Sequence, residues 1–268
     1  MSYVNSTWVD AYLARIGAGR PARPDAGALR DLHLRQLRTV PFENLGIHLG
    51  EDIVLAEGPL VEKIVDRRRG GFCYELCGAF AALLSALGYE VDLLAARVFG
   101  DDGLGVPYDH MALRVGSWLA DVGFGSHTHF PLRFDERGDQ ADPGGVFRIA
   151  ETTDGDLDVL RDGRPAYRLE TRPRALRDFE AGCWWHRTSP KSHFTRSLVC
   201  SMLTETGRVT LSGRKLVRTA GGERHERLLD GDAEVLAAYR TLFGIELDRV
   251  PEVRTPPSDA RPPEPAGG

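Results

Sequence analysis

One cysteine in the sequence stands in a setting typical of a nucleophile. Cys73 follows two glycines, Gly70 and Gly71, and opens a segment in which apolar residues recur at helical spacing. The glycines allow a sharp bend, and the unpaired N–H groups at the start of a helix favour a negative charge. We therefore expect a lowered pKa for the Cys73 thiol, which would make it reactive. A core cysteine on the buried face of the helix is the alternative interpretation.

A cysteine nucleophile needs a base, and His110 is the best placed of the eight histidines. It stands at the start of the strand pattern 111–115, where a rigid element can hold an imidazole beside a cleft. Asp121 closes the apolar run 117–122 and can orient the imidazole and stabilise its positive charge. Only Val115-Gly116-Ser117 separate the two strands, so we expect a hairpin that brings His110 beside Asp121. A structural hydrogen-bonding role for Asp121 stays open.

Two other patterns could bind ligands. Cys73 and Cys77 are spaced as i and i+4, but no second cysteine pair stands at the spacing of a zinc site, so we expect no metal. The stretch Gly123-Phe124-Gly125-Ser126 follows a strand and can offer backbone N–H groups to a phosphate. It lacks the lysine and the spacing of a Walker loop, so it predicts no nucleotide-binding class by itself.

Composition limits the function classes. The 268 residues carry 34 basic and 39 acidic side chains, a net charge of −5, which argues against a nucleic-acid binder that works through a broad cationic surface. No apolar run approaches the roughly 20 residues that span a bilayer, and the start lacks a signal-peptide pattern. Four cysteines are too few for a disulfide scaffold in a chain of this length. We therefore expect a cytoplasmic protein that binds neither nucleic acid nor membrane.

The hydrophobic period changes along the chain. It is helical up to Gly88 and then alternates with period 2 between turn residues. We expect a small sheet or barrel, with a hairpin turn at Asp162-Gly163, followed by a short helix over 173–182 and a final helix over 232–243 that stops at Gly244. Proline-rich composition from Pro251 onward predicts a disordered tail. The expected strands are 91–98, 111–115, 117–122, 146–149, 157–161, 167–171, 197–203, 208–211 and 215–218.

The residues around the cysteine match a known family. Arg69-Gly70-Gly71-Phe72-Cys73-Tyr74-Glu75-Leu76 resembles the active-site signature of the arylamine N-acetyltransferases. Val40-Pro41-Phe42-Glu43-Asn44-Leu45, His110 and Asp121-Val122-Gly123-Phe124-Gly125 recur in the family's order, and 188–194 is similar to its third-segment pattern. The resemblance covers roughly residues 8 to 245.

The resemblance implies an α+β fold with a cysteine-protease-like Cys-His-Asp triad. It divides the chain into an N-terminal helical bundle (1–88), a central β-barrel (89–186), a C-terminal α/β lid (187–250) and the tail (251–268). By the same match, Cys73 is the acyl-accepting nucleophile, His110 its proton partner and Asp121 the orienting carboxylate.

The resemblance also implies an activity. Family members use acetyl-CoA as the acyl donor, hold no permanent cofactor, and acetylate an arylamine, arylhydrazine or N-hydroxyarylamine by a ping-pong mechanism through an acetyl-cysteine thioester. Gly123, Phe124, Gly125 and Ser126 match the loop near the coenzyme. Phe42, Phe124 and Phe194 match positions that line the acceptor and coenzyme cleft, with core packing as the alternative for each ring.

Some positions depart from the family pattern, and two rival functions use the same residue types. Cys77 stands where the family usually has Asn, so we expect the polar contact behind the nucleophile to be missing or remodelled. Trp184 and Trp185 replace the usual third-segment pattern. An amide synthase that releases a polyketide from a carrier thioester resembles the family in triad and chain order. A papain-like or transglutaminase-like cysteine hydrolase would use the same three residue types.

Overall fold

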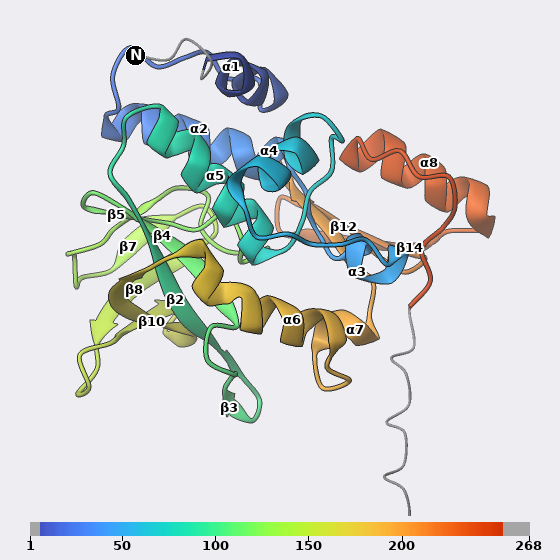
Figure 1. Ribbon diagram of the computed structural model, residues 1–268. Coiled ribbons are helices and arrows are strands. Elements are labelled where there is room, and N and C mark those ends of the chain that lie inside the picture. The colour runs from blue at the N-terminus through green and yellow to red at the C-terminus, as the bar shows by residue number, and fades with distance from the viewer. Residues whose placement is uncertain (1–5, 254–268) are drawn as a thin grey trace, which may run out of the picture.

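The chain before Gly88 is mainly helical, as its apolar spacing predicts. The computed structural model describes residues 6–253 (Figure 1). Asp25 caps the second helix as expected, with Oδ1 accepting a hydrogen bond of 2.9 Å from the Ala28 N–H. Gly88, at φ +92°, follows the helix that begins at Cys73. The helices are α1 (Ser6–Arg15), α2 (Ala26–Thr39), α3 (Leu45–Leu49), α4 (Glu57–Val65) and α5 (Cys73–Ala86).

The segment after Gly88 forms an antiparallel sheet that curls into a nearly closed barrel. Its strands follow the order β6-β5-β4-β2-β10-β9-β8-β7, and β3 pairs with β2. The Gln140 side chain joins the two edges, because it accepts from the Arg133 N–H at 2.7 Å and donates to the Arg133 carbonyl at 3.0 Å. The strands are β2 (Val91–Gly100), β3 (Gly103–Leu104), β4 (His110–Val115), β5 (Trp118–Ala120), β6 (Leu132–Arg133), β7 (Gln140–Asp142), β8 (Gly145–Glu151), β9 (Leu157–Arg161) and β10 (Arg164–Arg174).

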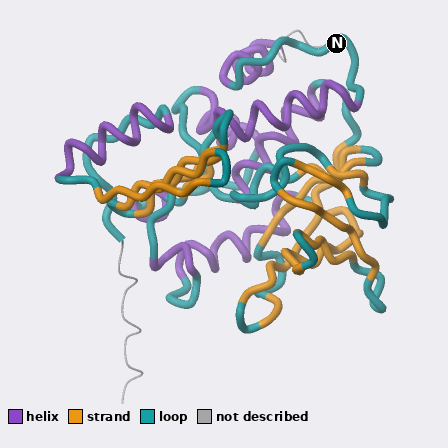
Figure 2. The backbone as a smooth tube through the Cα atoms, turned by 180° about the vertical axis from the view of Figure 1, so that it is seen from behind, coloured by secondary structure: helices purple, strands orange, loops and turns teal. Residues whose placement is uncertain are grey.

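The last part of the chain builds a second, smaller sheet, and Figure 2 shows the two sheets as separate groups of strands. Its order is β1-β11-β12-β13-β14, so β1 (Phe42–Glu43), from the helical part, completes it. Helix α8 (Gly231–Phe243) packs against it and ends at Gly244, as predicted. The other elements are the 3₁₀ helix η2 (Leu176–Phe179), α6 (Glu180–Thr188), α7 (His193–Arg196), β11 (Cys200–Leu203), β12 (Gly207–Ser212), β13 (Lys215–Ala220) and β14 (Glu223–Leu228).

The structure differs from the sequence expectation in several elements. The strands β1, β3, β6 and β7 are missing from the prediction, because two or three residues are too few to show a period of 2. The helix predicted over 173–182 has the wrong bounds, because β10 continues to Arg174 and α6 runs on to Thr188. The expected boundary between barrel and lid, after residue 186, therefore falls inside α6. Strand β14 is missing from the prediction because all its side chains are exposed and no apolar alternation marks it. Of the expected disordered tail, 254–268 lie outside the described residues.

Strand β4 separates two hydrophobic clusters by the alternation of its side chains. Met111 and Leu113 pack among the helices, in the cluster that also contains Cys73, whereas Ala112 packs inside the barrel. By the same alternation His110 faces the barrel interior, where its ring centroid lies 5.2 Å from that of Phe124. The strand therefore presents His110 at the junction between the barrel and α5. No helix within residues 6–253 has the length and apolar character needed to cross a membrane.

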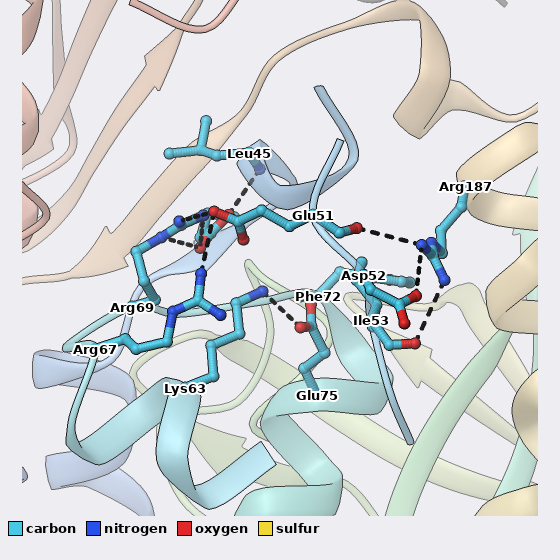
Figure 3. Close-up of polar contacts among 11 residues, drawn as sticks. Leu45, Glu51, Asp52, Ile53, Lys63, Arg67, Arg69, Phe72, Glu75 and Arg187 are labelled. Carbon is cyan, nitrogen blue, oxygen red and sulfur yellow. Dashed lines mark hydrogen bonds and ion pairs between the residues drawn. The ribbon is translucent and has the colours of Figure 1, made fainter. Parts of the chain in front are cut away.

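Buried ion pairs hold the helical layer together (Figure 3). Lys63 of α4 donates to Glu75 of α5 at 2.5 Å, and both side chains are buried. Arg69 binds Glu43 at 2.8 Å and Glu51 at 2.8 Å. Burial alone would lower the pKa of Lys63, but the charges of Glu75 and Glu43 outweigh it and raise the pKa. Lys63 is therefore held as a cation, whereas burial raises the pKa of the Glu75 carboxyl despite the attraction of Lys63.

A second set of contacts in Figure 3 attaches α6 to the loop after α3. Arg187 donates to the carbonyls of Glu51, at 3.2 Å, and Ile53, at 3.4 Å, and lies 3.3 Å from a carboxylate oxygen of Asp52. Glu51 binds both Arg69 and Arg187, so one polar network connects the loop before Cys73 with α6.

Replacing Lys63 with methionine should lower the free energy of unfolding by about 3–5 kcal/mol, because it leaves the Glu75 carboxylate buried without its partner. Urea unfolding followed by circular dichroism measures the change. Arg20→Met is the matched control: its pair with Asp10 is largely exposed, so its loss should cost less than about 1 kcal/mol. Equal losses in the two variants would contradict this account of the buried pair.

Candidate active site

Cys73 is the first residue of α5, and close packing of the preceding loop places it there. A Cβ on Gly70 would lie 1.8 Å from the Pro41 carbonyl oxygen, and a Cβ on Gly71 would lie 2.6 Å from the Glu75 side chain. Neither glycine is among the described residues with positive φ. The chain bends at Phe72, as expected, and the two glycines allow the close approach to neighbouring groups that this loop needs.

The segment 40–45 builds one wall of the site. The Glu43 N–H donates to the Gly71 carbonyl at 2.9 Å, which ties β1 to the loop before Cys73. The Asn44 amide donates to the carbonyls of Phe194, at 3.0 Å, and Ser197, at 2.6 Å. Asn44 therefore holds the lid segment that carries Phe194 against the helical part, which explains why these residue types occur together in the motif.

The predicted pairing of His110 and Asp121 is present. His110 Nε2 lies 2.8 Å from Asp121 Oδ2, and the other carboxylate oxygen accepts from the N–H groups of Gly123, at 2.9 Å, and Phe124, at 3.0 Å. Burial alone would raise the pKa of the Asp121 carboxyl, but attraction to His110 and these hydrogen bonds outweigh it and hold the pKa at about 2. Asp121 is therefore a buried carboxylate at neutral pH.

The Cys73 thiol lies against the backbone on both sides of His110. Its Sγ is 3.9 Å from the Asp109 carbonyl oxygen and accepts from the Met111 N–H. A Cβ on Gly123 would lie 2.8 Å from Cys73 Cα, so the loop that follows Asp121 packs directly on the first turn of α5. The structure thus brings the three residues singled out in the sequence to the junction of α5, β4 and the end of β5.

The pKa of the thiol differs from the sequence expectation. Burial, followed by the negative charge of Asp121, raises the pKa of Cys73 above its ordinary value, and only 3% of the residue is exposed. The lowered pKa predicted from the helix start is therefore wrong, because loss of solvent outweighs the favourable helix end. Cys73 rests as a thiol, and a base must remove its proton.

Cys77 makes a polar contact of its own one helical turn after Cys73. Its thiol donates to the Met111 carbonyl at 3.2 Å, and burial raises its pKa, so it stays a thiol. The contact is therefore remodelled rather than missing. Cys183 and Cys200 are buried too, and all four cysteines are free. No group of three or more His, Cys, Asp or Glu side chains within residues 6–253 is arranged to hold a metal ion.

The three phenylalanines singled out in the sequence divide between two places. The rings of Phe42 and Phe194 lie 5.9 Å apart, and a Cβ on Gly125 would lie 3.7 Å from the Phe42 ring. Phe72 joins them, 5.6 Å from Phe194. Phe124 instead lies beside His110 at the barrel mouth, as described above. The structure therefore brings Phe42 and Phe194 together and places Phe124 separately.

Sequence reasoning missed a histidine that supports Asp121. His33 of α2 is fully buried; its Nε2 accepts from the Asp121 N–H at 3.2 Å, and its Nδ1 lies 3.0 Å from the His129 carbonyl. Burial lowers its pKa, so it is neutral at pH 7. The only sequence signal was that His33 lies on the apolar face of a predicted helix. That pattern does not reveal that its partner is Asp121, which is distant in sequence.

An open cavity of about 980 Å³ lies between the barrel and the lid sheet, beside the loop that follows Asp121. Ser126 and His127 line it together with charged side chains: Arg38, Arg161, Arg208, Arg224, Lys215 and Glu205. Burial and repulsion by Arg161 lower the pKa of Arg208 to about 10. Neither Arg38 nor Arg208 forms an ion pair with any residue in 6–253. Within the described part of the chain, the cavity therefore carries unpaired positive charge at Arg38 and Arg208, whereas its other cations, Arg161, Lys215 and Arg224, pair with Asp162 or Glu226.

Comparison with known proteins assigns the family. A family profile described as N-acetyltransferase matches residues 25–252. The arylamine N-acetyltransferase of Mycolicibacterium smegmatis is 38% identical over 252 residues, which cover 88% of this chain and 91% of that protein. The arylamine N-acetyltransferase of Escherichia coli is 33% identical, with 88% of each chain covered.

Solved structures agree in fold over nearly the same span. The arylamine N-acetyltransferase of Salmonella typhimurium superposes with a TM-score of 0.84 at 29% identity, covering 93% of this chain and 95% of that one. The Mycobacterium marinum arylamine N-acetyltransferase in complex with CoA gives 0.81 at 32% identity, covering 88% and 92%. With a matching family profile, relatives above 30% identity over most of their length and a shared fold, this chain belongs to the arylamine N-acetyltransferase family.

Proposed function

We propose that this protein transfers the acetyl group of acetyl-CoA to an arylamine, arylhydrazine or N-hydroxyarylamine through a thioester on Cys73. The observation that carries the proposal is the convergence of a buried thiol with the hydrogen-bonded pair His110–Asp121, in a chain of this family. The comparisons favour this activity over the amide synthase and the cysteine hydrolase, because the relatives that cover most of the chain are named arylamine N-acetyltransferases.

His110 supplies the base. A carboxylate only accepts hydrogen bonds, so the 2.8 Å contact with Asp121 places the ring proton on Nε2 and leaves Nδ1 as the basic nitrogen. Because burial keeps Cys73 as a thiol, its proton passes to Nδ1 as the sulfur attacks. The Asp121 carboxylate stabilises the imidazolium that forms.

In both half-reactions each bond formed is matched by a bond broken, and the proton passes through His110. In the first, Cys73 Sγ bonds to the acetyl carbonyl carbon, the bond from that carbon to the coenzyme sulfur breaks, and the coenzyme sulfur takes the proton from His110. In the second, the amine nitrogen bonds to the same carbon and gives a proton to His110. The bond to Sγ then breaks and the thiol regains its proton. Burial of Cys73 limits access of water to the thioester.

The cationic cavity supports binding of the coenzyme's phosphates. The loop Gly123-Phe124-Gly125-Ser126 runs from the first turn of α5, where Gly123 packs on Cys73, to the cavity wall, where Ser126 lies. An acyl donor whose reactive end reaches Cys73 would pass along this loop. Its phosphates would then meet Arg38 and Arg208, which form no ion pair among residues 6–253, and Arg161, which lies 3.7 Å from Asp162.

The aromatic pair Phe42 and Phe194 supports an aromatic acceptor. With Phe72 beside them, the two rings form an apolar wall next to the loop before Cys73. Planar amines gain from offset or edge contacts with such rings. The lid contributes Phe194 and the helical part contributes Phe42, so acceptor binding would involve both segments.

Cys73→Ala should abolish release of CoA from acetyl-CoA in the presence of a hydrazine, because no thioester can form. The matched control is Cys200→Ala, in the core of the lid, which should keep most of the activity. A thiol reagent follows CoA release, and circular dichroism checks the fold. Substantial acetyl transfer by Cys73→Ala would exclude Cys73 as the nucleophile.

Asp121→Asn should lower kcat by about two to four orders of magnitude, because an amide can donate to Nε2 and so move the ring proton to Nδ1, the nitrogen that must accept it. Steady-state rates with acetyl-CoA and an arylhydrazine measure the loss. A rate close to that of the unmodified protein would reduce Asp121 to a structural acid.

Arg208→Met should raise the KM for acetyl-CoA by about tenfold or more, because a charged contact to phosphate is lost. The same change should leave the melting temperature unchanged or higher, since Arg208 is a half-buried cation that has no ion-pair partner among residues 6–253 and bonds only the neutral Ser201 hydroxyl. Arg148→Met, whose partner Asp139 is exposed, is the control. An unchanged KM for acetyl-CoA would move the phosphate site elsewhere.

A further inference from the structure

A buried histidine of α6 contacts the backbone beside the proposed nucleophile. His186 is 8% exposed; its Nε2 lies 2.9 Å from the Asp109 carbonyl oxygen, and its Nδ1 lies 3.2 Å from Ser192 Oγ. The Asp109 carbonyl immediately precedes His110 and is also the oxygen that lies 3.9 Å from Cys73 Sγ. One carbonyl oxygen therefore faces both the lid histidine and the thiol.

The hydrogen-bond partners fix the direction of each bond. Burial lowers the pKa of His186 to about 4, despite its bond to the Asp109 carbonyl, so the ring carries one proton at neutral pH. A carbonyl only accepts, so that proton lies on Nε2, and Nδ1 accepts from the Ser192 hydroxyl. Ser192 Oγ in turn accepts from the Phe194 N–H at 3.2 Å. A continuous chain of donors thus runs from the lid to the Asp109 carbonyl.

The peptide before His110 is held in place from several sides. Tyr108 has a positive φ of 62°, and its carbonyl accepts from the Tyr74 hydroxyl at 2.6 Å. A Cβ on Gly182 of α6 would lie 2.4 Å from the same carbonyl oxygen. The Asp109 carboxylate accepts from the Val98 N–H at 2.9 Å. With its neighbours fixed in this way, the Asp109 carbonyl cannot easily turn away from the thiol.

We propose that His186 is a positioning residue that occupies the Asp109 carbonyl and thereby keeps the Cys73 thiol proton available to His110. An N–H donor at 2.9 Å makes a full hydrogen bond, whereas the thiol at 3.9 Å makes a weak one. Without the imidazole, the carbonyl's partial negative charge would hold the proton on sulfur and oppose the thiolate. This inference rests on the proposed roles of Cys73 and His110.

Other titratable groups act on the thiol but are the same in every variant of His186. After burial itself, the charges of Asp121, Cys183 and Asp109 all raise the pKa of Cys73. Burial raises the pKa of Asp109 to about 6, so its titration appears in all pH profiles. A difference in the alkylation pKa between His186 variants therefore reports whether a donor to the Asp109 carbonyl is present.

The test compares His186→Phe with His186→Gln in the full chain. Phenylalanine keeps a ring among Phe72, Tyr74 and Phe194 but has no donor, whereas the glutamine amide nitrogen can replace Nε2 as a donor. The readouts are the pH dependence of Cys73 alkylation by iodoacetamide, located by peptide mass spectrometry, and kcat/KM for acetyl-CoA. The Kd for CoA, measured by calorimetry, controls for binding.

We expect His186→Phe to raise the apparent pKa of alkylation by about one unit and to lower kcat/KM about tenfold, with the Kd for CoA unchanged. His186→Gln should stay within about threefold of the unmodified protein. An unchanged alkylation profile in folded His186→Phe, or an equal loss in His186→Gln, would overturn the inference.

A second variant tests the same inference if the first variant does not fold. If His186→Phe does not fold, Ser192→Ala removes the donor to Nδ1, and it should shift the alkylation profile in the same direction by a smaller amount. An unchanged alkylation profile would refute the inference.

Different results would refute the proposed function and the role of His186. An unmodified protein that releases no CoA refutes the acetyltransferase, whereas normal acetyl transfer with identical alkylation profiles refutes only the role of His186.

Discussion

The arrangement of the site depends on one buried carboxylate. Asp121 accepts hydrogen bonds from His110, Gly123 and Phe124, and these contacts keep it ionised where an unpaired acid would be costly. The same contacts have three structural effects. They fix the tautomer of the imidazole, turn the chain after β5 into a tight loop, and press Gly123 against the first turn of α5. Cys73, His110 and the loop that begins at Gly123 are therefore brought together around a single side chain.

The remaining contacts join parts of the chain that are far apart in sequence. Arg69 binds Glu43 and Glu51, Asn44 holds the lid segment 194–199, and His186 of α6 reaches the carbonyl before His110. None of the three segments could complete the site alone, because each supplies groups that another segment orients. The cost of burying the charged groups explains why their partners occur together in the motifs around Phe42 and Cys73.

Local patterns predicted much of this arrangement. Helical spacing located α5, alternation located β4, and the short link between two strands predicted that His110 lies beside Asp121. Three features could not be read from local patterns. The raised pKa of Cys73 follows from burial by groups remote in sequence. The roles of His33 and His186 depend on backbone atoms of other segments, and β14 has no apolar face to mark it. The division into bundle, barrel and lid rests on the family resemblance alone and stays a prediction, and its expected boundary after residue 186 lies inside α6.

The central claim is that acetyl transfer passes through Cys73 before any amine takes part. Rapid mixing of the protein with acetyl-CoA alone, with CoA release and the mass of the Cys73 peptide followed together, tests it most directly. The account predicts a burst of about one CoA per chain, one acetyl group on Cys73, and little further release until an arylamine is added. Release of CoA only after the amine is present, with Cys73 never acetylated, would contradict it.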